Sequence, residues 1–229
     1  LLGAVAAVMA RSQSLWVCEN GVGAVNLWLN EGQLGIDNAR GVHPLSLIQI
    51  SEFLNPTIQQ PLQINNSFQF WTKAEMCRPL KRLGLDNLMT ETVSCDSFPL
   101  RIRGVPQCGL CTSCLLRRLA LHAADLEHVD PGEGYHYDVK GLLTGVDEKR
   151  MYPLGATLDH VDRLRGCLSS ESAWETLTET FPELLEIQEE TVRHKDGNPQ
   201  EIANAYVQMY LTYVTEWERF PLGALATTM

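Results

Sequence analysis

The sequence predicts an α/β domain that carries a four-cysteine metal segment and continues into a helical extension. An apolar stretch rich in alanine and valine at residues 2–14 leads into a short, buried apolar strand at residues 15–18, which is half of a βαβ unit. Four cysteines gather within residues 95–114, and amphipathic helical patterns follow later in the chain. We therefore expect an α/β domain over residues 1–127, a linker over 128–153 and a helical extension over 154–229.

The composition limits the classes of function. Of the 229 residues, 45% are hydrophobic and 20% are charged, as in ordinary globular proteins. A net charge of -10 argues against a protein that coats nucleic acid with a broad basic surface. No stretch reaches the roughly 18 apolar residues of a membrane span. Seven cysteines, an odd number with one tight cluster, do not suggest a disulfide framework, so we expect a reducing, cytoplasmic setting.

Local signals place the elements that follow the first strand. Glycine and asparagine are frequent in residues 19–43, which predicts a long loop of the kind that often carries function. Pro44 suits the first position of a helix, and the Asn-Pro pair at Pro56 predicts that this helix ends near Leu54. Alternating apolar side chains in residues 61–70 then predict an extended segment.

Two helix starts have the spacing of a capping box, in which two side chains each satisfy a free backbone donor. Thr72 and Glu75 form the first, and we expect its helix to end at Gly84. Ser172 and Glu175 have the same spacing and predict a second box in the helical extension.

Helical patterns also follow the cysteines and dominate the extension. Residues 115–126 are one such pattern, and we interpret Arg117 and Arg118 as part of a solvated face, with a phosphate contact as the alternative. Pro182 suits a helix start, and Pro199 begins the clearest helix of the chain, which Pro221 ends. An apolar stripe that we expect to be buried recurs along this last helix at spacings of three and four residues: Ile202, Ala205, Tyr206, Met209, Tyr210, Tyr213, Val214 and Trp217.

Four cysteines have the spacing of ligands to one metal ion: Cys95, Cys108, Cys111 and Cys114. The two-residue gaps let neighbouring thiolates converge in a turn, and Gly109 eases the backbone there. Four thiolates leave no open position, which predicts a closed, structural zinc site. The alternatives are an iron–sulfur cluster, whose cysteine run would continue soon after Cys114, and cysteines without a metal.

The cysteine block resembles the zinc segment of 7-cyano-7-deazaguanine synthases, the QueC type. That family has Ser-Cys, then Cys-Gly-x-Cys-x-x-Cys followed by Arg, which residues 94–95 and 108–117 match. Residues 72–75 are similar to the family's Thr-Lys-x-Glu helix start. Residues 19–26 look most like the divergent branch found with bacterial anti-phage defence genes. The resemblance covers about residues 1–122.

The resemblance implies a partial Rossmann-like fold of the ATP pyrophosphatase, or adenine nucleotide alpha hydrolase, type. It also implies an ATP-dependent ligase of queuosine-type biosynthesis or anti-phage defence. Such an enzyme adenylates the carboxylate of 7-carboxy-7-deazaguanine, lets ammonia displace AMP and dehydrates the amide to a nitrile. The implied cofactors are structural zinc and ATP with Mg²⁺, and the implied partners are ATP and a deazapurine-like small molecule. The helical extension is a candidate surface for protein partners.

Two departures from the family qualify this implication. The family's Ser-Gly-Gly-x-Asp-Ser phosphate loop does not occur in these residues, and the apolar first ten residues have the character of an internal helix. We therefore expect an N-terminally shortened chain that is inactive alone. Residues 35–44 replace the family's Tyr-Pro-Asp-Cys-Arg segment, which leaves the substrate open. A non-catalytic partner subunit and a nucleic-acid-binding zinc module are the alternative functions.

Five residues are candidates for small-molecule binding, and no catalytic residue is assigned. Glu19 and Asn20 follow the first strand, where ligand sites of α/β folds lie, and are candidates for the substrate site. Asp37 and Arg40 share the loop before Pro44, and an arginine there would bind a phosphate or carboxylate. Lys73, at a helix start, is the candidate for phosphate binding. The structural alternatives are a turn, a helix cap and a solvated side chain.

Overall fold

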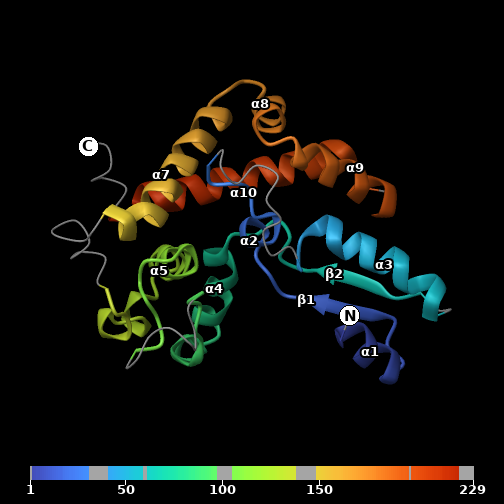
Figure 1. Ribbon diagram of the computed structural model, residues 1–229, viewed down its shortest axis with the longest axis horizontal. Coiled ribbons are helices and arrows are strands. Elements are labelled where there is room, and N and C mark those ends of the chain that lie inside the picture. The colour runs from blue at the N-terminus through green and yellow to red at the C-terminus, as the bar shows by residue number, and fades with distance from the viewer. Residues whose placement is uncertain are drawn as a thin grey trace. The chain divides into compact units, whose positions relative to one another are not determined.

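The computed structural model describes residues 2–30, 41–58, 61–96, 105–137, 148–195 and 197–221. This part of the chain is mostly helical, with a two-stranded parallel sheet and a cluster of four cysteines (Figure 1). No helix within these ranges is both long and apolar enough to cross a membrane. A Rossmann-like domain stays a prediction.

The chain divides into two compact units, and each unit draws on three stretches of sequence. Unit 1 consists of Leu1–Leu27, Gly35–Trp71 and Gly166–Leu211. Unit 2 consists of Trp28–Leu34, Thr72–Arg165 and Thr212–Met229. The division that we predicted from the sequence alone, with a linker at residues 128–153, stays a prediction.

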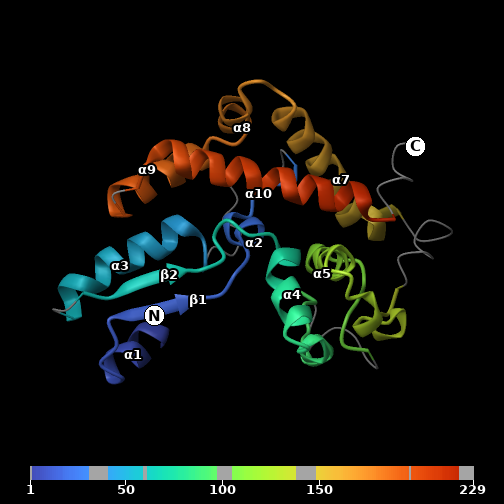
Figure 2. The same cartoon turned by 180° about the vertical axis from the view of Figure 1, so that it is seen from behind.

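Unit 1 contains the sheet. Strand β1 (Ser14–Val17) runs parallel to β2 (Gln63–Asn66), with Ser14 opposite Gln63 and Val17 opposite Asn66. Helix α1 (Leu2–Met9) precedes β1 and α3 (Pro44–Ile58) precedes β2, and Figures 1 and 2 show the two helices beside their strands. Small and aliphatic side chains form the core between these elements: Ala4, Ala7, Leu54 and Leu62, with Leu15, Ile50, Ile58 and Ile64 packed against them.

Two expectations for this region were wrong. The first strand is not buried, because Trp16 is 61% exposed while its neighbours on the other face are half-buried. Helix α3 does not end at Leu54 but continues through Pro56 to Ile58. Side-chain contacts sustain its last turn, since the Thr57 hydroxyl donates to the Phe53 carbonyl at 2.9 Å. Ile58 in this turn also packs against the core of unit 1, and this tertiary packing overrides the local stop signal.

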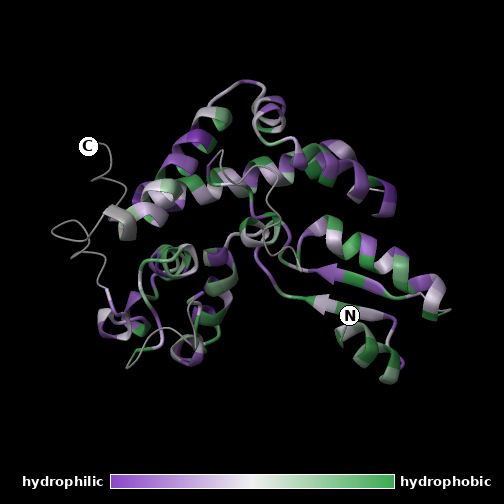
Figure 3. Cartoon of the chain, viewed as in Figure 1, coloured by the Kyte–Doolittle hydropathy of each residue, from purple (hydrophilic) through white to green (hydrophobic). Residues whose placement is uncertain are grey.

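The helices of the extension form as predicted, although α7 begins earlier than we expected. Helix α10 buries the predicted stripe, with Ala205 only partly covered. In unit 1, Tyr206 of this helix is fully buried, meets the ring of Phe70 edge-on at 4.9 Å and accepts a hydrogen bond from Gln69 at 3.0 Å. Figure 3 shows hydrophobic and hydrophilic residues interspersed along these helices, which are α7 (Glu148–Leu168), α8 (Ala173–Thr180), α9 (Glu183–Lys195) and α10 (Pro199–Arg219).

Only one of the two predicted capping boxes forms. Thr72 accepts from the Glu75 amide at 3.2 Å and donates its own amide to the Glu75 carboxylate at 2.7 Å. Ser172 makes no side-chain cap, because its ψ of 57° is far from the extended value that capping needs. Its hydroxyl lies 3.3 Å from that of Ser170 instead. The second box was therefore a wrong prediction.

In unit 2, helix α4 packs against α5 and begins at the confirmed cap. The predicted stop is also correct, since Gly84 follows α4 in the left-handed conformation with φ 65°. Small and aliphatic residues form the hydrophobic core here: Ala74, Cys77, Ala120, Leu121, Ala124, Leu126 and Val129. The elements around it are α4 (Lys73–Arg82), η2 (Asp86–Glu91), α5 (Thr112–Ala123), η3 (Glu127–Val129) and η4 (Gly132–Gly134).

Candidate metal centre

The four predicted ligands lie together at the start of α5. The Sγ atoms of Cys95, Cys108, Cys111 and Cys114 are all within 4.8 Å of one another, and those of Cys108 and Cys114 are 3.9 Å apart. A zinc ion bound tetrahedrally at about 2.3 Å would hold its sulfurs about 3.8 Å apart. All seven cysteines of the chain are free thiols in this structure. The geometry fits four thiolates around one metal ion.

Backbone amides point at three of the sulfurs. The amides of Leu110 and Cys111 both donate to Cys108 Sγ at 3.3 Å, and the Cys114 amide donates to Cys111 Sγ at 3.4 Å. The Cys108 amide donates to Cys95 Sγ at 3.3 Å. Hydrogen bonds of this kind favour a negatively charged sulfur. The turn around the cluster is therefore arranged to receive thiolates.

The cluster needs a cation to hold all four thiolates. The contact with Cys114, followed by burial, raises the pKa of the Cys111 thiol well above its ordinary value. Burial raises the pKa of Cys108, and the negative charge of Cys111 raises it further. Bringing four thiolates this close is unfavourable without a compensating positive charge, and a divalent metal ion supplies it.

Gly109 allows a second segment to close over the cysteine turn. Its φ is 85°, and a Cβ atom at this position would lie 2.3 Å from the Tyr137 carbonyl oxygen. Residues 135–137, which we call the strap, lie along the turn at this point. The Tyr137 amide donates to the Cys108 carbonyl at 3.1 Å, and the His136 amide donates to the Gln107 carbonyl at 2.9 Å. A side chain at Gly109 would displace the strap.

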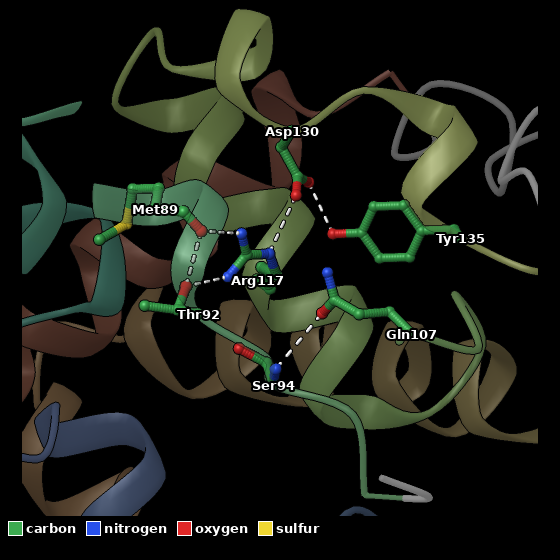
Figure 4. A network of polar contacts seen from close by, with 7 residues as sticks. All are labelled: Met89, Thr92, Ser94, Gln107, Arg117, Asp130 and Tyr135. Atoms are coloured by element: carbon green, nitrogen blue, oxygen red, sulfur yellow. Dashed lines mark hydrogen bonds and ion pairs between the residues drawn. The ribbon is translucent and has the colours of Figure 1, made fainter. Parts of the chain in front are cut away.

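Arg117 is buried beside the cluster, so its predicted place on a solvated face was wrong. It is 4% exposed and uses three nitrogens of its guanidinium (Figure 4). Nε donates to Asp130 at 2.9 Å, Nη1 donates to the Thr92 hydroxyl at 2.6 Å, and Nη2 donates to the Met89 carbonyl at 2.7 Å. Nothing local in the sequence identifies Asp130 as its partner, which is why sequence reasoning missed this network.

Tyr135 connects the same network to the strap. Its hydroxyl donates to Asp130 at 2.6 Å, and its ring lies 3.7 Å from the guanidinium carbon of Arg118. Burial and the contact with Asp130 raise the pKa of Tyr135, so the phenol stays protonated. Gln107 completes the connections by accepting the Ser94 amide at 3.3 Å (Figure 4). Polar contacts therefore join every segment that carries a cysteine of the cluster.

The two candidates after β1 lie at the carboxyl edge of the sheet. The Glu19 carboxylate accepts from the Asn20 amide at 3.0 Å, and its backbone carbonyl accepts from the Asn66 side chain at 2.8 Å. Asn20 is 1% exposed and caps α2 (Gly21–Val25) by accepting from the Gly23 amide at 2.9 Å. Asn20 thus has a structural task, and a substrate role for Glu19 and Asn20 stays a prediction.

Three further residues were predicted to bind substrate or phosphate. Lys73 is the first residue of α4 and is half-buried, and a phosphate role for it stays a prediction. Asp37 and Arg40 lie outside the described residues. Lys73 belongs to unit 2, whereas Glu19 and Asn20 belong to unit 1.

Sequence reasoning also missed a buried carboxylate in unit 2. Glu216 is 5% exposed, accepts from the Thr72 hydroxyl at 2.8 Å and pairs with Arg78 at 3.3 Å. Burial raises the pKa of Glu216 to about 7, although Thr72 and Arg78 both act to lower it. Its position beside Trp217, within the apolar end of α10, was the one signal available in the sequence.

Comparison of the chain with models of known protein families gives no match, and comparisons with curated proteins and with solved structures give none either. Any assignment of function therefore depends on the cysteine cluster and on the sequence motif that builds it.

Proposed function

We propose that this chain is part of an ATP-dependent ligase similar to 7-cyano-7-deazaguanine synthases, in which the cysteine cluster holds a structural zinc ion. One observation carries the proposal: the Cys-Gly-x-Cys-x-x-Cys motif and the upstream Cys95 bring four sulfurs within 4.8 Å of one another. That motif is also the most specific part of the resemblance to this family.

A structural role follows from the ligands themselves. Four thiolates fill the coordination sphere of zinc, so no position remains for water or substrate. Bound there, zinc would supply folding energy by joining the segment before Cys95 to helix α5. The metal would thus stabilise one part of the enzyme and leave the reaction to other residues.

The surroundings of the cluster argue against the nucleic-acid alternative. Zinc modules that bind nucleic acid present free cationic side chains to phosphates. Here Arg117 is buried against Asp130, and Arg118 lies over the ring of Tyr135. Both arginines that follow the cysteines thus make contacts within the fold. The net charge of -10 also argues against nucleic-acid binding.

Metal analysis tests the first half of the proposal. Protein purified under reducing conditions should contain about one zinc per chain. Cobalt substitution should give the visible bands of a tetrahedral four-thiolate site. Brown protein with iron and acid-labile sulfide would contradict zinc and favour an iron–sulfur cluster.

Nucleotide chemistry tests the second half. The complete polypeptide encoded by the gene should form AMP and pyrophosphate from ATP when 7-carboxy-7-deazaguanine is present, and ammonia should convert the adenylate to the amide. Mass spectrometry of the products detects each step. Zinc-loaded complete polypeptide that binds ATP with Mg²⁺ but forms no AMP would contradict the ligase and favour a non-catalytic partner subunit.

The chain of 229 residues provides a matched comparison. It contains no Ser-Gly-Gly-x-Asp-Ser loop, and backbone amides of such a loop are what neutralise nucleotide phosphates. We therefore expect calorimetry on this chain to show weak ATP binding or none. Micromolar binding would mean that the nucleotide site lies elsewhere than the family resemblance implies.

A further inference from the structure

One buried side chain joins the two ends of the cysteine segment. Arg117 lies one helical turn after Cys114 on α5. Its two terminal nitrogens donate to Thr92 and Met89, in the stretch that leads to Cys95. Arg117 therefore ties the helix that carries the last ligand to the stretch that carries the first.

Asp130 extends this connection to the central cysteine turn. One carboxylate oxygen accepts from Arg117 at 2.9 Å, and the other accepts from the Tyr135 hydroxyl at 2.6 Å (Figure 4). Tyr135 is 6% exposed and packs among the cysteine side chains. The backbone amides of the next two strap residues donate hydrogen bonds to the carbonyls of Gln107 and Cys108. The chain of contacts that starts at Arg117 thus ends on the turn that presents the remaining ligands.

Only a guanidinium fits this position. Arg117 uses a nitrogen for each of three acceptors, and its planar fork fixes the angles between them. A lysine ammonium is a single point and cannot span the same three acceptors. None of the three partners is a cysteine of the cluster, so Arg117 acts on the ligands through the segments that carry them.

We propose that Arg117, acting through Asp130 and Tyr135, positions the three cysteine segments for zinc, so that zinc binding and closure of the strap are linked. This inference rests on the zinc centre of the proposed function. This linkage is reciprocal. If the closed strap and its network increase the affinity for zinc, bound zinc stabilises the closed strap by the same free energy. Zinc release would therefore open residues 135–137 as well as the cysteine turn.

Zinc affinity tests the positioning role, and competition with a chromophoric chelator measures it. Arg117→Lys should weaken zinc binding by about 10- to 100-fold, as loss of outer contacts does at other metal sites, and should speed zinc transfer to the chelator. The cobalt spectrum should keep its four-thiolate shape, because every ligand remains. Arg82→Lys is the matched control, since Arg82 is exposed on α4.

Hydrogen exchange tests the linkage itself. The amides of His136 and Tyr137 should be protected in the zinc-loaded chain and should exchange rapidly after chelation. Helix α9, in unit 1, should keep its protection in both states. In Arg117→Lys, protection of the strap should fall even at saturating zinc, a change that general destabilisation would not confine to these residues.

The results separate this inference from the zinc centre. Wild-type protein that binds zinc, together with Arg117→Lys whose affinity stays within about twofold, would overturn the inference alone. Wild-type protein without zinc would overturn both. If Arg117→Lys does not fold, Tyr135→Phe decides the matter, because it removes only the hydroxyl that reaches Asp130. Several-fold weaker zinc binding in Tyr135→Phe would support the inference, and unchanged binding would overturn it.

Discussion

The cysteine segment of unit 2 and the surroundings of Tyr206 in unit 1 are stabilised in different ways. Several buried side chains around the cysteines are polar or charged, and Arg117, Gln107 and Tyr135 each reach another segment by a hydrogen bond. Around Tyr206 the contacts are aromatic, with one polar contact from Gln69.

This difference determines what each region responds to. Area buried in an aromatic core stabilises a protein under any ordinary solution condition. A cluster of thiolates holds together only with its metal and in a reducing medium. The cysteine segment should therefore be the part of the chain that metal and redox conditions control.

Removing the metal is the largest perturbation that separates the two regions. Cys111→Ser should abolish tight zinc binding and remove on the order of 10 kcal/mol of metal-derived folding energy from its segment. Hydrogen exchange should then show loss of protection in residues 105–137, while β1, β2 and α9 in unit 1 keep theirs. Cys18→Ser, which changes an exposed thiol outside the cluster, should leave zinc content and exchange unchanged. Collapse of both regions together would break the comparison.

Truncation in the aromatic region should have the converse effect. Tyr206→Ala should lower the free energy of unfolding by about 3–5 kcal/mol, because it removes a fully buried aromatic ring. Zinc content should stay at that of wild type. Tyr206→Phe serves as the control, since it removes only the acceptor for Gln69 and should cost about 1 kcal/mol. Loss of zinc from Tyr206→Ala would show that the regions depend on each other.

A smaller difference in stability is expected between Thr72 and Ser172, the two positions that have the sequence spacing of a capping box. Thr72→Ala should cost about 1–2 kcal/mol, because Thr72 caps α4 and also donates to Glu216. Ser172→Ala should change stability by no more than about 0.5 kcal/mol, since Ser172 caps nothing. Urea unfolding of both variants measures the difference. Equal losses at the two positions would contradict the observed caps.

The smallest effect concerns pH and Glu216. Burial raises the pKa of Glu216 from an ordinary 4.5 to about 7, so the folded chain binds this proton more tightly than the unfolded chain does. Its contribution to stability is complete below pH 4.5 and is lost as pH rises through about 7. As the pH rises from 6 to 8, the free energy of unfolding of Glu216→Gln should therefore increase by about 1 kcal/mol relative to that of wild type.

Comparing the variant with wild type at each pH cancels the pH dependence of the zinc site. Arg78 and Arg219 act to lower the pKa of Glu216, whereas Glu75 raises it. Glu218→Gln is the control, because that carboxylate is about half exposed and pairs with Arg165. A difference between wild type and Glu216→Gln that does not change with pH would show that the carboxylate is ionised throughout.

Features that depend on neighbours in sequence were predictable, and features that depend on distant partners were not. The cysteine ligands converge because two-residue gaps leave the turn little freedom, and Thr72 caps a helix whose third residue is Glu75. The burial of Arg117 depends on Met89, which precedes α5 in the sequence, and on Asp130, which follows it. Only the fold brings these two residues to Arg117.

The error at the end of helix α3 has the same cause, whereas the error at Ser172 is a local one. Helix α3 passes Pro56 because Ile58 in its final turn packs against the core that contains Leu62, a contact that does not follow from the Asn-Pro pair. Ser172 and Glu175 have the sequence spacing of a capping box, but the ψ angle of Ser172 does not allow the cap. Asp37 and Arg40 lie outside the described residues, so the predicted substrate loop stays a prediction.

The close approach of Gly109 to the Tyr137 carbonyl has a consequence for recognising related sequences. The spacing of the cysteines does not by itself show whether a related sequence also has the strap. A relative with the same strap must also keep a glycine directly after its second cysteine, because a side chain there would meet the carbonyl and would be strained at a φ of 85°. That glycine, an arginine three residues after the last cysteine and a tyrosine in the strap together form a fingerprint. Searching with these positions added to the cysteines would separate true relatives from chance matches.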